Sequence, residues 1–147
     1  NCSRYCILRI PILYGPTENM SESAVTILVT QLQDHSLKEL FLDDGAIRYP
    51  TLTTDAARAL QFLIKKESMG IYHYTAEEPF TKYGMAVLMA SILKITGKRI
   101  YPDPNPGTGA GRPLNSHLNN TKIRRLGFDS YTPFREGIPL VLQKVFL

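Results

Sequence analysis

The feature that most constrains the fold is the run CILRI at residues 6–10, which is followed at once by a loop with proline and glycine at residues 11–20. Short, nearly continuous apolar runs of this kind are typical of strands that are buried on both faces inside a parallel sheet. Such a strand needs neighbours on both sides. Because few residues precede it, we expect the neighbouring strands to lie outside this chain.

The remaining pattern alternates helices with extended pieces, which is typical of an α/β fold. We expect a strand at GIYHYTA, residues 70–76, and a turn at Asp44-Gly45 between two extended pieces. Five helices are expected, beginning at Ser21 as N-cap, after Thr53 or Thr54, at Thr81, at Asn119 or Asn120, and at Thr132-Pro133. Gly97 is expected to end the third helix and Gly127 the fourth.

Helical spacing also predicts which side chains form the core. The first helix is expected to bury Val25, Leu28, Val29 and Leu32; the second Ala56, Ala59, Leu60, Leu63 and Ile64; the third Met85, Leu88, Met89 and Ile92.

Composition places the chain among globular proteins. With 147 residues, 44% hydrophobic and 20% charged, it is long enough for one domain, which we take as residues 1–147. No apolar run reaches the roughly 20 residues of a transmembrane helix, and the first residues do not resemble a secretory signal. The net charge is +4, but the basic pairs are scattered, which favours solvated helix ends over a nucleic-acid surface.

Several motifs resemble chemical sites without fulfilling their requirements. The two cysteines, Cys2 and Cys6, are too far apart along a strand to form a disulfide, and no Cys/His set suggests zinc. The glycines of GTGAG fall in a Pro/Gly-rich loop, residues 101–113, with no strand before them, so a dinucleotide fingerprint is not favoured. The pair Asp43-Asp44 fits a turn better than a carboxylate site.

The whole chain resembles the C-terminal half of extended short-chain dehydrogenases/reductases. Four stretches carry the resemblance: LRIPILYG at 8–15, RYPTLTTDAA at 48–57, FTKYGMA at 80–86, and RPLNSHLNNTKIRRLG at 112–127. Within that superfamily the chain looks most like the group of dTDP-4-dehydrorhamnose reductase and the regulatory beta subunits of methionine adenosyltransferase. LRIPILYG, TKYGMA and TPFREGI favour the beta subunits.

This resemblance implies a Rossmann-type fold whose N-terminal dinucleotide-binding half is absent, with residues 1–16 forming its last strands and loop. The family's catalytic Tyr-x-x-x-Lys pair is missing from the sequence, so the chain is not expected to be an enzyme as it stands. NADP is expected only with the missing half, and would meet the backbone of Pro11, Ile12 and Leu13 at the carboxyl edge of the sheet. Core packing is an equally good role for Leu13.

The resemblance also suggests substrate-binding residues. In a substrate pocket, Tyr14 would offer a hydroxyl, and Arg112 a guanidinium group that binds an anion through two hydrogen bonds. The alternatives are a packed tyrosine and an arginine that holds its own loop. Asp55, near the start of a helix, is expected to complete the cap and to favour the helix dipole. No catalytic or metal residue is assigned.

The final stretch suggests a partner. In the beta subunits a C-terminal tail enters the catalytic subunit, and here Leu142, Val145, Phe146 and Leu147 are the apolar residues suited to that contact. Pro139 is expected to kink or restart the helix, and packing of the helix on its own domain is the alternative. The implied function is a cytoplasmic, non-catalytic regulatory subunit; the alternative is the substrate-binding half of an NADP-dependent reductase. The unpaired strand edge also predicts self-association.

Overall fold

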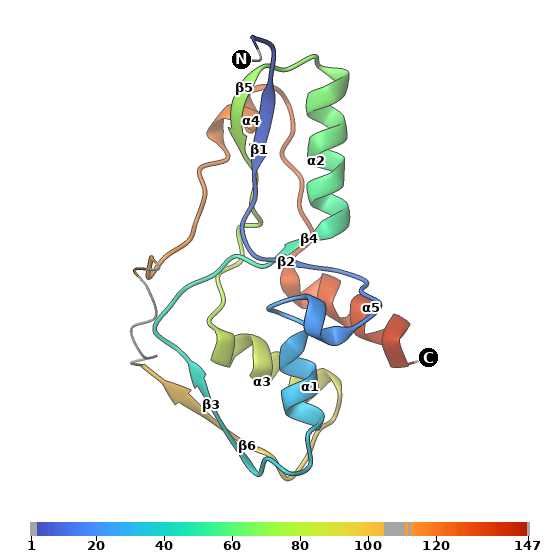
Figure 1. Ribbon diagram of the computed structural model, residues 1–147, viewed down its shortest axis with the longest axis vertical. Coiled ribbons are helices and arrows are strands. Elements are labelled where there is room, and N and C mark those ends of the chain that lie inside the picture. Colours follow the sequence, from blue (N-terminus) through green and yellow to red (C-terminus); the bar gives the residue numbers. More distant parts are fainter. Residues whose placement is uncertain (1–2, 105–110, 112, 147) are drawn as a thin grey trace.

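The computed structural model describes residues 3–104, 111 and 113–146, and these form an upper and a lower region in the view of Figure 1. The sheet region, at the top of Figure 1, contains β1 (Cys6–Arg9), α2 (Thr53–Lys65), β5 (Gly70–His73) and α4 (Thr121–Arg125). The helical region below it contains the 3₁₀ turn η1 (Met20–Glu22), α1 (Ile27–Gln33), β3 (Glu39–Asp43), α3 (Lys82–Ile92), β6 (Arg99–Asp103) and α5 (Phe134–Phe146). Strands β2 (Leu13–Tyr14) and β4 (Thr51–Leu52) lie between the two regions.

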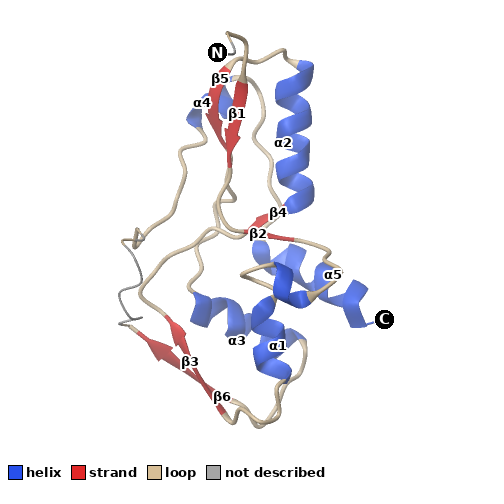
Figure 2. Ribbon diagram, viewed as in Figure 1, coloured by secondary structure: helices blue, strands red, loops and turns tan. Residues whose placement is uncertain are grey.

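The strands form three separate parallel pairs in the described part of the chain, visible as three red pairs in Figure 2. Strand β1 pairs with β5, β2 with β4, and β3 with β6. The two predicted strands and the predicted α/β alternation are therefore confirmed, although β1 ends at Arg9 and β5 at His73, before the predicted ends at residues 10 and 76. Each pair is parallel because a helical segment crosses over between its two strands.

The helical region encloses the larger core. Its buried residues come from its three helices, from β2 and β3, and from the residues just before α1 and α3: Tyr14, Val25, Leu28, Val29, Leu32, Leu40, Phe80, Met85, Ala86, Met89, Phe134, Ile138, Val141 and Leu142. The stripes predicted for the first and third helices point into this core, with Leu88 and Ile92 packed at its margin. Thr81 caps α3 as predicted, because its hydroxyl accepts a hydrogen bond from Gly84 N at 3.0 Å.

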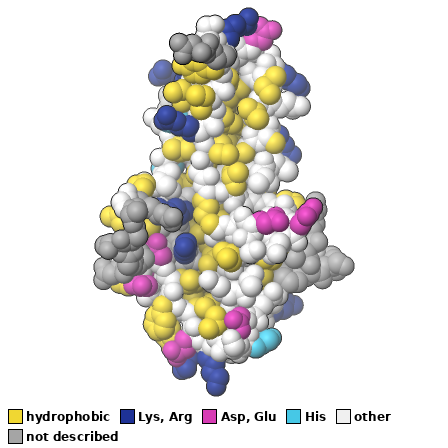
Figure 3. All heavy atoms as spheres, viewed as in Figure 1, with side chains coloured by type: hydrophobic (Ala, Val, Ile, Leu, Met, Phe, Trp, Pro, Cys, Tyr) yellow, Lys and Arg dark blue, Asp and Glu magenta, His cyan; other side chains and the backbone are white. Residues whose placement is uncertain are grey.

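The sheet region has a smaller core, formed by Ala56, Ala59, Leu63, Tyr72, Tyr74 and Ile123. The prediction that Leu60 and Ile64 point inward is wrong: Leu60 is 44% and Ile64 67% exposed. In β1, the predicted apolar face is also exposed, with Ile7 at 46%. Figure 3 shows hydrophobic side chains running down this face of the sheet region, over β1 and α2. The strand has the sequence of a fully buried strand, but among the described residues it has only one neighbouring strand, β5.

The structure corrects several predicted boundaries. Ser21 lies inside the 3₁₀ turn, whose N-cap is Asn19, and α1 begins only at Ile27, after Ser23 Oγ has accepted a hydrogen bond from Val25 N. Helix α3 ends at Ile92, before Gly97, since Lys94 already adopts a positive φ of 53°. Residues 101–103 of the predicted loop pair with β3 as part of β6, and residues 105–110 and 112 lie outside the described residues. Pro139 lies within one continuous helix, α5, and does not restart it.

Candidate functional site at the carboxyl ends of the strands

The candidate site is the junction, which we define as residues 10–15, 48–52, 74–77 and 115–120. These segments meet where β1 and β5 end and where β2 pairs with β4. In open parallel sheets, ligands bind just outside the carboxyl ends of the strands. The junction is therefore the place where a ligand of this fold is expected.

The loop predicted to meet a cofactor is tied into the junction by its own backbone. Ile12 O accepts a hydrogen bond from Thr51 N at 3.0 Å, and Leu13 O accepts one from the Ser23 hydroxyl at 2.9 Å. The side chain of Leu13 packs against the core of the sheet region and that of Ile12 against the core of the helical region. Pro11 is half-buried. Of the backbone carbonyls of Pro11, Ile12 and Leu13, the last two therefore accept hydrogen bonds within the chain. A dinucleotide bound here has only the other backbone groups of this loop to contact.

Gly15 closes this loop for a steric reason. A Cβ atom at this position would collide with the hydroxyl of Thr53, the first residue of α2. The glycine therefore allows the loop to pass close to the start of α2 and to hold the two regions together.

Tyr14 does not face a pocket: it is fully buried in the core of the helical region, edge-on to Phe134 with the ring centroids 4.9 Å apart. A Cβ atom at Gly137 would collide with its hydroxyl, which has no hydrogen-bond partner among the described residues. Burial, followed by the nearby charge of Asp55, raises the pKa of this tyrosine well above its ordinary value. These observations favour the alternative interpretation, a packed tyrosine, over a substrate-binding one.

Asp55 has a different role from the one expected. It is buried, but α2 has no side-chain cap, and the Asp55 carboxylate reaches the other end of the chain instead. Its Oδ2 accepts a hydrogen bond from Thr132 N at 2.6 Å, and its Oδ1 lies 3.0 Å from Arg58 Nη1. Asp55 therefore connects the first turn of α2 to the residues just before α5. Its place in the first turn, which suits the helix dipole, is as expected.

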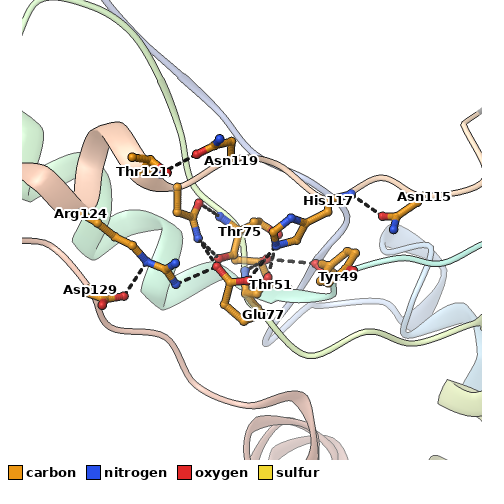
Figure 4. A network of polar contacts seen from close by, with 12 residues as sticks. Tyr49, Thr51, Thr75, Glu77, Asn115, His117, Asn119, Thr121, Arg124 and Asp129 are labelled. Carbon is orange, nitrogen blue, oxygen red and sulfur yellow. Dashed lines mark hydrogen bonds and ion pairs between the residues drawn. The ribbon is translucent and has the colours of Figure 1, made fainter.

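Sequence reasoning missed the polar network that fills the junction (Figure 4). At its centre, the side-chain amide of Asn120 makes the two backbone hydrogen bonds that a neighbouring strand would make. Its Oδ1 accepts a hydrogen bond from Thr75 N at 3.0 Å, and its Nδ2 donates to Thr75 O at 2.8 Å. The same amide nitrogen donates to Glu77 Oε1 at 2.9 Å. The buried amide therefore satisfies the backbone after β5 and fixes one oxygen of Glu77.

The other contacts of Glu77 use the whole carboxylate. Arg124 Nη2 lies 2.7 Å from Oε1, and His117 Nε2 lies 2.8 Å from Oε2. Arg124 also pairs with Asp129 through Nε at 2.7 Å, and the His117 ring packs on Tyr49 with centroids 4.4 Å apart. Because both oxygens of Glu77 are engaged, the arrangement positions the 113–125 segment against β5 and leaves no free general base at this position.

The remaining predicted site residues lie away from the junction or outside the described residues. Arg112 lies outside them, although its neighbour Pro113 accepts a hydrogen bond from Arg48 Nη1 at 3.0 Å. Leu142 was assigned to a partner contact, but it is buried in the core of its own domain, so that assignment is wrong. Val145 and Phe146 lie in the last turn of α5; their side chains, and Leu147 entirely, lie outside the described part.

Among the described residues, no group of three or more His, Cys, Asp and Glu side chains is placed to hold a metal ion. Cys6 is a free, exposed cysteine. No helix in the described part of the chain combines the length and apolar character needed to span a membrane.

Comparison with known proteins identifies relatives of two kinds. The chain is 36% identical over 138 residues to methionine adenosyltransferase 2 subunit beta of Mus musculus, covering 90% of this chain and 41% of that protein. It is 34% identical over 146 residues to the same subunit of Danio rerio, covering 94% of this chain and 45% of that protein. The chain thus spans less than half the length of the curated relatives it matches.

Solved structures show the same fold. A dTDP-4-dehydrorhamnose reductase from Clostridium acetobutylicum superposes with a TM-score of 0.81 at 22% identity, covering 97% of this chain and 49% of that chain. The reductase from Bacillus anthracis, solved in complex with NADP, gives a TM-score of 0.80 at 22% identity, covering 95% of this chain and 48% of that chain. The fold is that of the substrate-binding portion of extended short-chain dehydrogenases/reductases. The model of the family named RmlD substrate binding domain matches residues 1–146, and the chain therefore belongs to this family.

Proposed function

We propose that this chain is the C-terminal portion of a cytoplasmic, non-catalytic regulatory subunit of methionine adenosyltransferase, which binds the catalytic subunit and modulates S-adenosylmethionine synthesis. The identity to the beta subunits carries the proposal: it reaches 37% over 138 residues, against 22% to the superposed reductases. The beta subunits of Mus musculus and Danio rerio are each at least 34% identical to this chain.

The chemistry of the junction supports a non-catalytic role. Tyr14 is buried, Glu77 is fully engaged, and no tyrosine in the sequence is followed by lysine four positions later. In the described junction, Tyr14 and Glu77 are therefore not available for proton transfer to a carbonyl, and the sequence lacks the Tyr-x-x-x-Lys pair.

NADP enters this proposal only with a dinucleotide-binding half supplied by the longer protein. When bound, the cofactor supplies hydride chemistry or, in a regulatory subunit, structural support. This chain contributes the backbone of Pro11–Leu13, whose Ile12 and Leu13 carbonyls are already engaged. The free edge of β1 is the position at which the sheet of that half joins the chain.

The proposal is tested by capture of the purified catalytic subunit on the immobilised 147-residue chain, together with the rate of S-adenosylmethionine formation. A form truncated after Gln143 removes the last turn of α5 and keeps the buried Leu142. Phe41→Ser, on the exposed face of β3, is the control variant. Capture by the full chain and the control, lost on truncation, supports the proposal and its tail contact. Equal capture by all forms would show that the last turn of α5 is not needed for binding. No capture by the full chain would contradict the proposal.

The second candidate is the substrate-binding half of an NADP-dependent dTDP-4-dehydrorhamnose reductase-like enzyme. The superposition on the NADP complex from Bacillus anthracis favours it. It predicts NADPH oxidation by a dTDP-4-keto sugar when a dinucleotide-binding half with Tyr-x-x-x-Lys is fused before Cys6. Absence of oxidation by a folded fusion that binds NADPH counts against it.

A further inference from the structure

The outer edge of β5 is open. On its inner edge, Gly70 N donates to Tyr5 O at 2.7 Å and Tyr74 N to Arg9 O at 3.0 Å. In a parallel pair, the N–H and C=O groups of one residue point to the same side, and successive residues alternate. The backbone groups of Ile71 and His73 therefore point away from β1. In the described part of the chain, no strand pairs with that edge.

A groove of about 600 Å³, the β5 groove, lies along this edge between β5 and α4, which run beside each other in Figure 1. Its walls carry basic, polar and apolar side chains and no acidic one: Ile71, Tyr72, His73, Asn119, Thr121, Lys122, Arg125 and Leu126. The groove is thus an unpaired strand edge with positive charge along one side.

Lys122 fixes one of these charges in place. Its Nζ donates to Ile71 O at 2.8 Å and lies 4.0 Å from the centroid of the Tyr72 ring. A lysine across a strand edge deters the addition of a long strand. It leaves the donor and the acceptor of His73 open, which limits pairing to a short segment.

Arg124 and Arg125 differ in whether an acidic side chain pairs with their positive charge. Arg124 is compensated by Glu77 and Asp129, as Figure 4 shows. Arg125 is exposed, and the structure gives it no hydrogen bond or ion pair with a described residue. It lies three residues after Lys122 on α4, so both side chains lie on the same side of the helix.

We propose that the β5 groove binds a short, extended, acidic peptide segment of another protein. The peptide backbone pairs with the N–H and C=O of His73, and an acidic side chain of the peptide meets Arg125. The strand edge favours a peptide over a free anion, because His73 offers an acceptor as well as a donor, and an anion uses donors only. The absence of acidic side chains among the groove residues favours an acidic sequence. This inference does not depend on the proposed function.

The test is fluorescence anisotropy with the 147-residue chain and a labelled ten-residue peptide of alternating valine and glutamate. The same peptide with lysine in place of glutamate tests the charge, and one with alternate N-methylated residues tests the backbone pairing. Arg125→Glu is expected to weaken binding of the acidic peptide by about tenfold or more, because it replaces an attraction with a repulsion. Lys38→Glu makes the same change of net charge in the helical region, and is expected to weaken binding less than about twofold at 0.15 M salt.

The position of binding is followed by amide NMR, where the shifts are expected at Ile71 and His73. Equal binding of the acidic and basic peptides would overturn the proposal. So would unchanged affinity in Arg125→Glu, shifts confined to the β1 residues, or complete displacement of the peptide by inorganic phosphate at constant ionic strength. Circular dichroism of each variant verifies that it is folded.

Discussion

The helical region and the sheet region differ in how completely they bury the same kinds of side chains. Among the described residues, fourteen form the buried core of the helical region and six form that of the sheet region. In the helical region, α1, α3 and α5 enclose their apolar faces. In the sheet region, β1 and α2 leave Ile7 and Ile64 in solvent. The sheet region therefore has the sequence of an inner layer but leaves much of it exposed, whereas the helical region buries a larger core between its three helices.

The largest expected effect is a core truncation in the helical region. Phe134 is fully buried and lies edge-on to both Tyr14 and Phe80. Phe134→Ala is expected to lower the free energy of unfolding by ~3–5 kcal/mol, because it removes a buried ring and leaves a cavity. Denaturant unfolding of the chain measures this. Phe41→Ala, at a 66% exposed position, is expected to cost less than ~1 kcal/mol, and an equal cost would contradict the assignment of the core.

A matched truncation in the sheet region is expected to cost less. Leu63 is buried, but it belongs to the smaller core, whose margin is formed by partly buried side chains such as Leu8 and Phe62, which can relax around the missing atoms. Leu63→Ala is expected to lower the free energy of unfolding by ~2–3 kcal/mol, near the lower end for such changes. The neighbouring Ile64→Ala is expected to change it by less than ~0.5 kcal/mol. If Ile64→Ala cost as much as Leu63→Ala, the exposed face would be covered in solution.

A third substitution removes a buried polar side chain from the junction. Asn120→Ala leaves the N–H and C=O of Thr75 without their partner and removes one contact of Glu77. The expected loss in unfolding free energy is ~1–3 kcal/mol. Asn115→Ala, which removes only an exposed turn bond to His117 N, is the control and is expected to have a smaller effect. The result that would contradict the role of Asn120 is an equal, small effect of both variants.

Each of the two cores holds a buried tyrosine whose pKa is raised, and this gives a prediction on pH. Burial raises the pKa of both Tyr14 and Tyr74 above the ordinary value of 10.0. The raised pKa means that the fold favours the neutral phenols, so this contribution to stability is intact below pH 10 and is lost as pH rises further. Because the Tyr14 hydroxyl has no partner, Tyr14→Phe is expected to move alkaline unfolding to higher pH at no cost near neutrality. Tyr74→Phe loses the bond to Ser130 O and is expected to lower stability below pH 10, where the wild-type phenol is neutral and makes this bond. Tyrosine absorbance against pH measures both; identical curves for the two variants would contradict the assignment.

The same contrast explains which parts of the structure could be predicted from the sequence. The α3 cap at Thr81 and the stripes of α1 and α3 depend on local spacing and on a partner within the chain, and they were predicted correctly. Leu60 and Ile64 have the spacing of core residues, but no described layer covers them. The spacing indicates an apolar face and does not indicate what packs on it.

The site was harder to predict than the fold. Asn120 and Arg124 lie 43 and 47 residues from Glu77, and no spacing rule connects them. The one local signal was Asn120 and Arg124 at i and i+4 on a short helix, which places both on one side of it. Tyr14 follows a family motif, but its burial depends on Phe134 and Gly137 far along the chain. Burial of this kind cannot be obtained from the loop alone.

The central claim is that β1 presents an open strand edge, while the helices of the helical region share one well-buried core. Hydrogen exchange of single amides in the dilute monomer tests it directly. Because the N–H groups of Cys6 and Leu8 point away from β5, they are expected to exchange at nearly the rate of an unstructured peptide, whereas amides within α3, such as that of Met89, exchange orders of magnitude more slowly. Equal, strong protection of Cys6, Leu8 and Met89 in a verified monomer would contradict the claim.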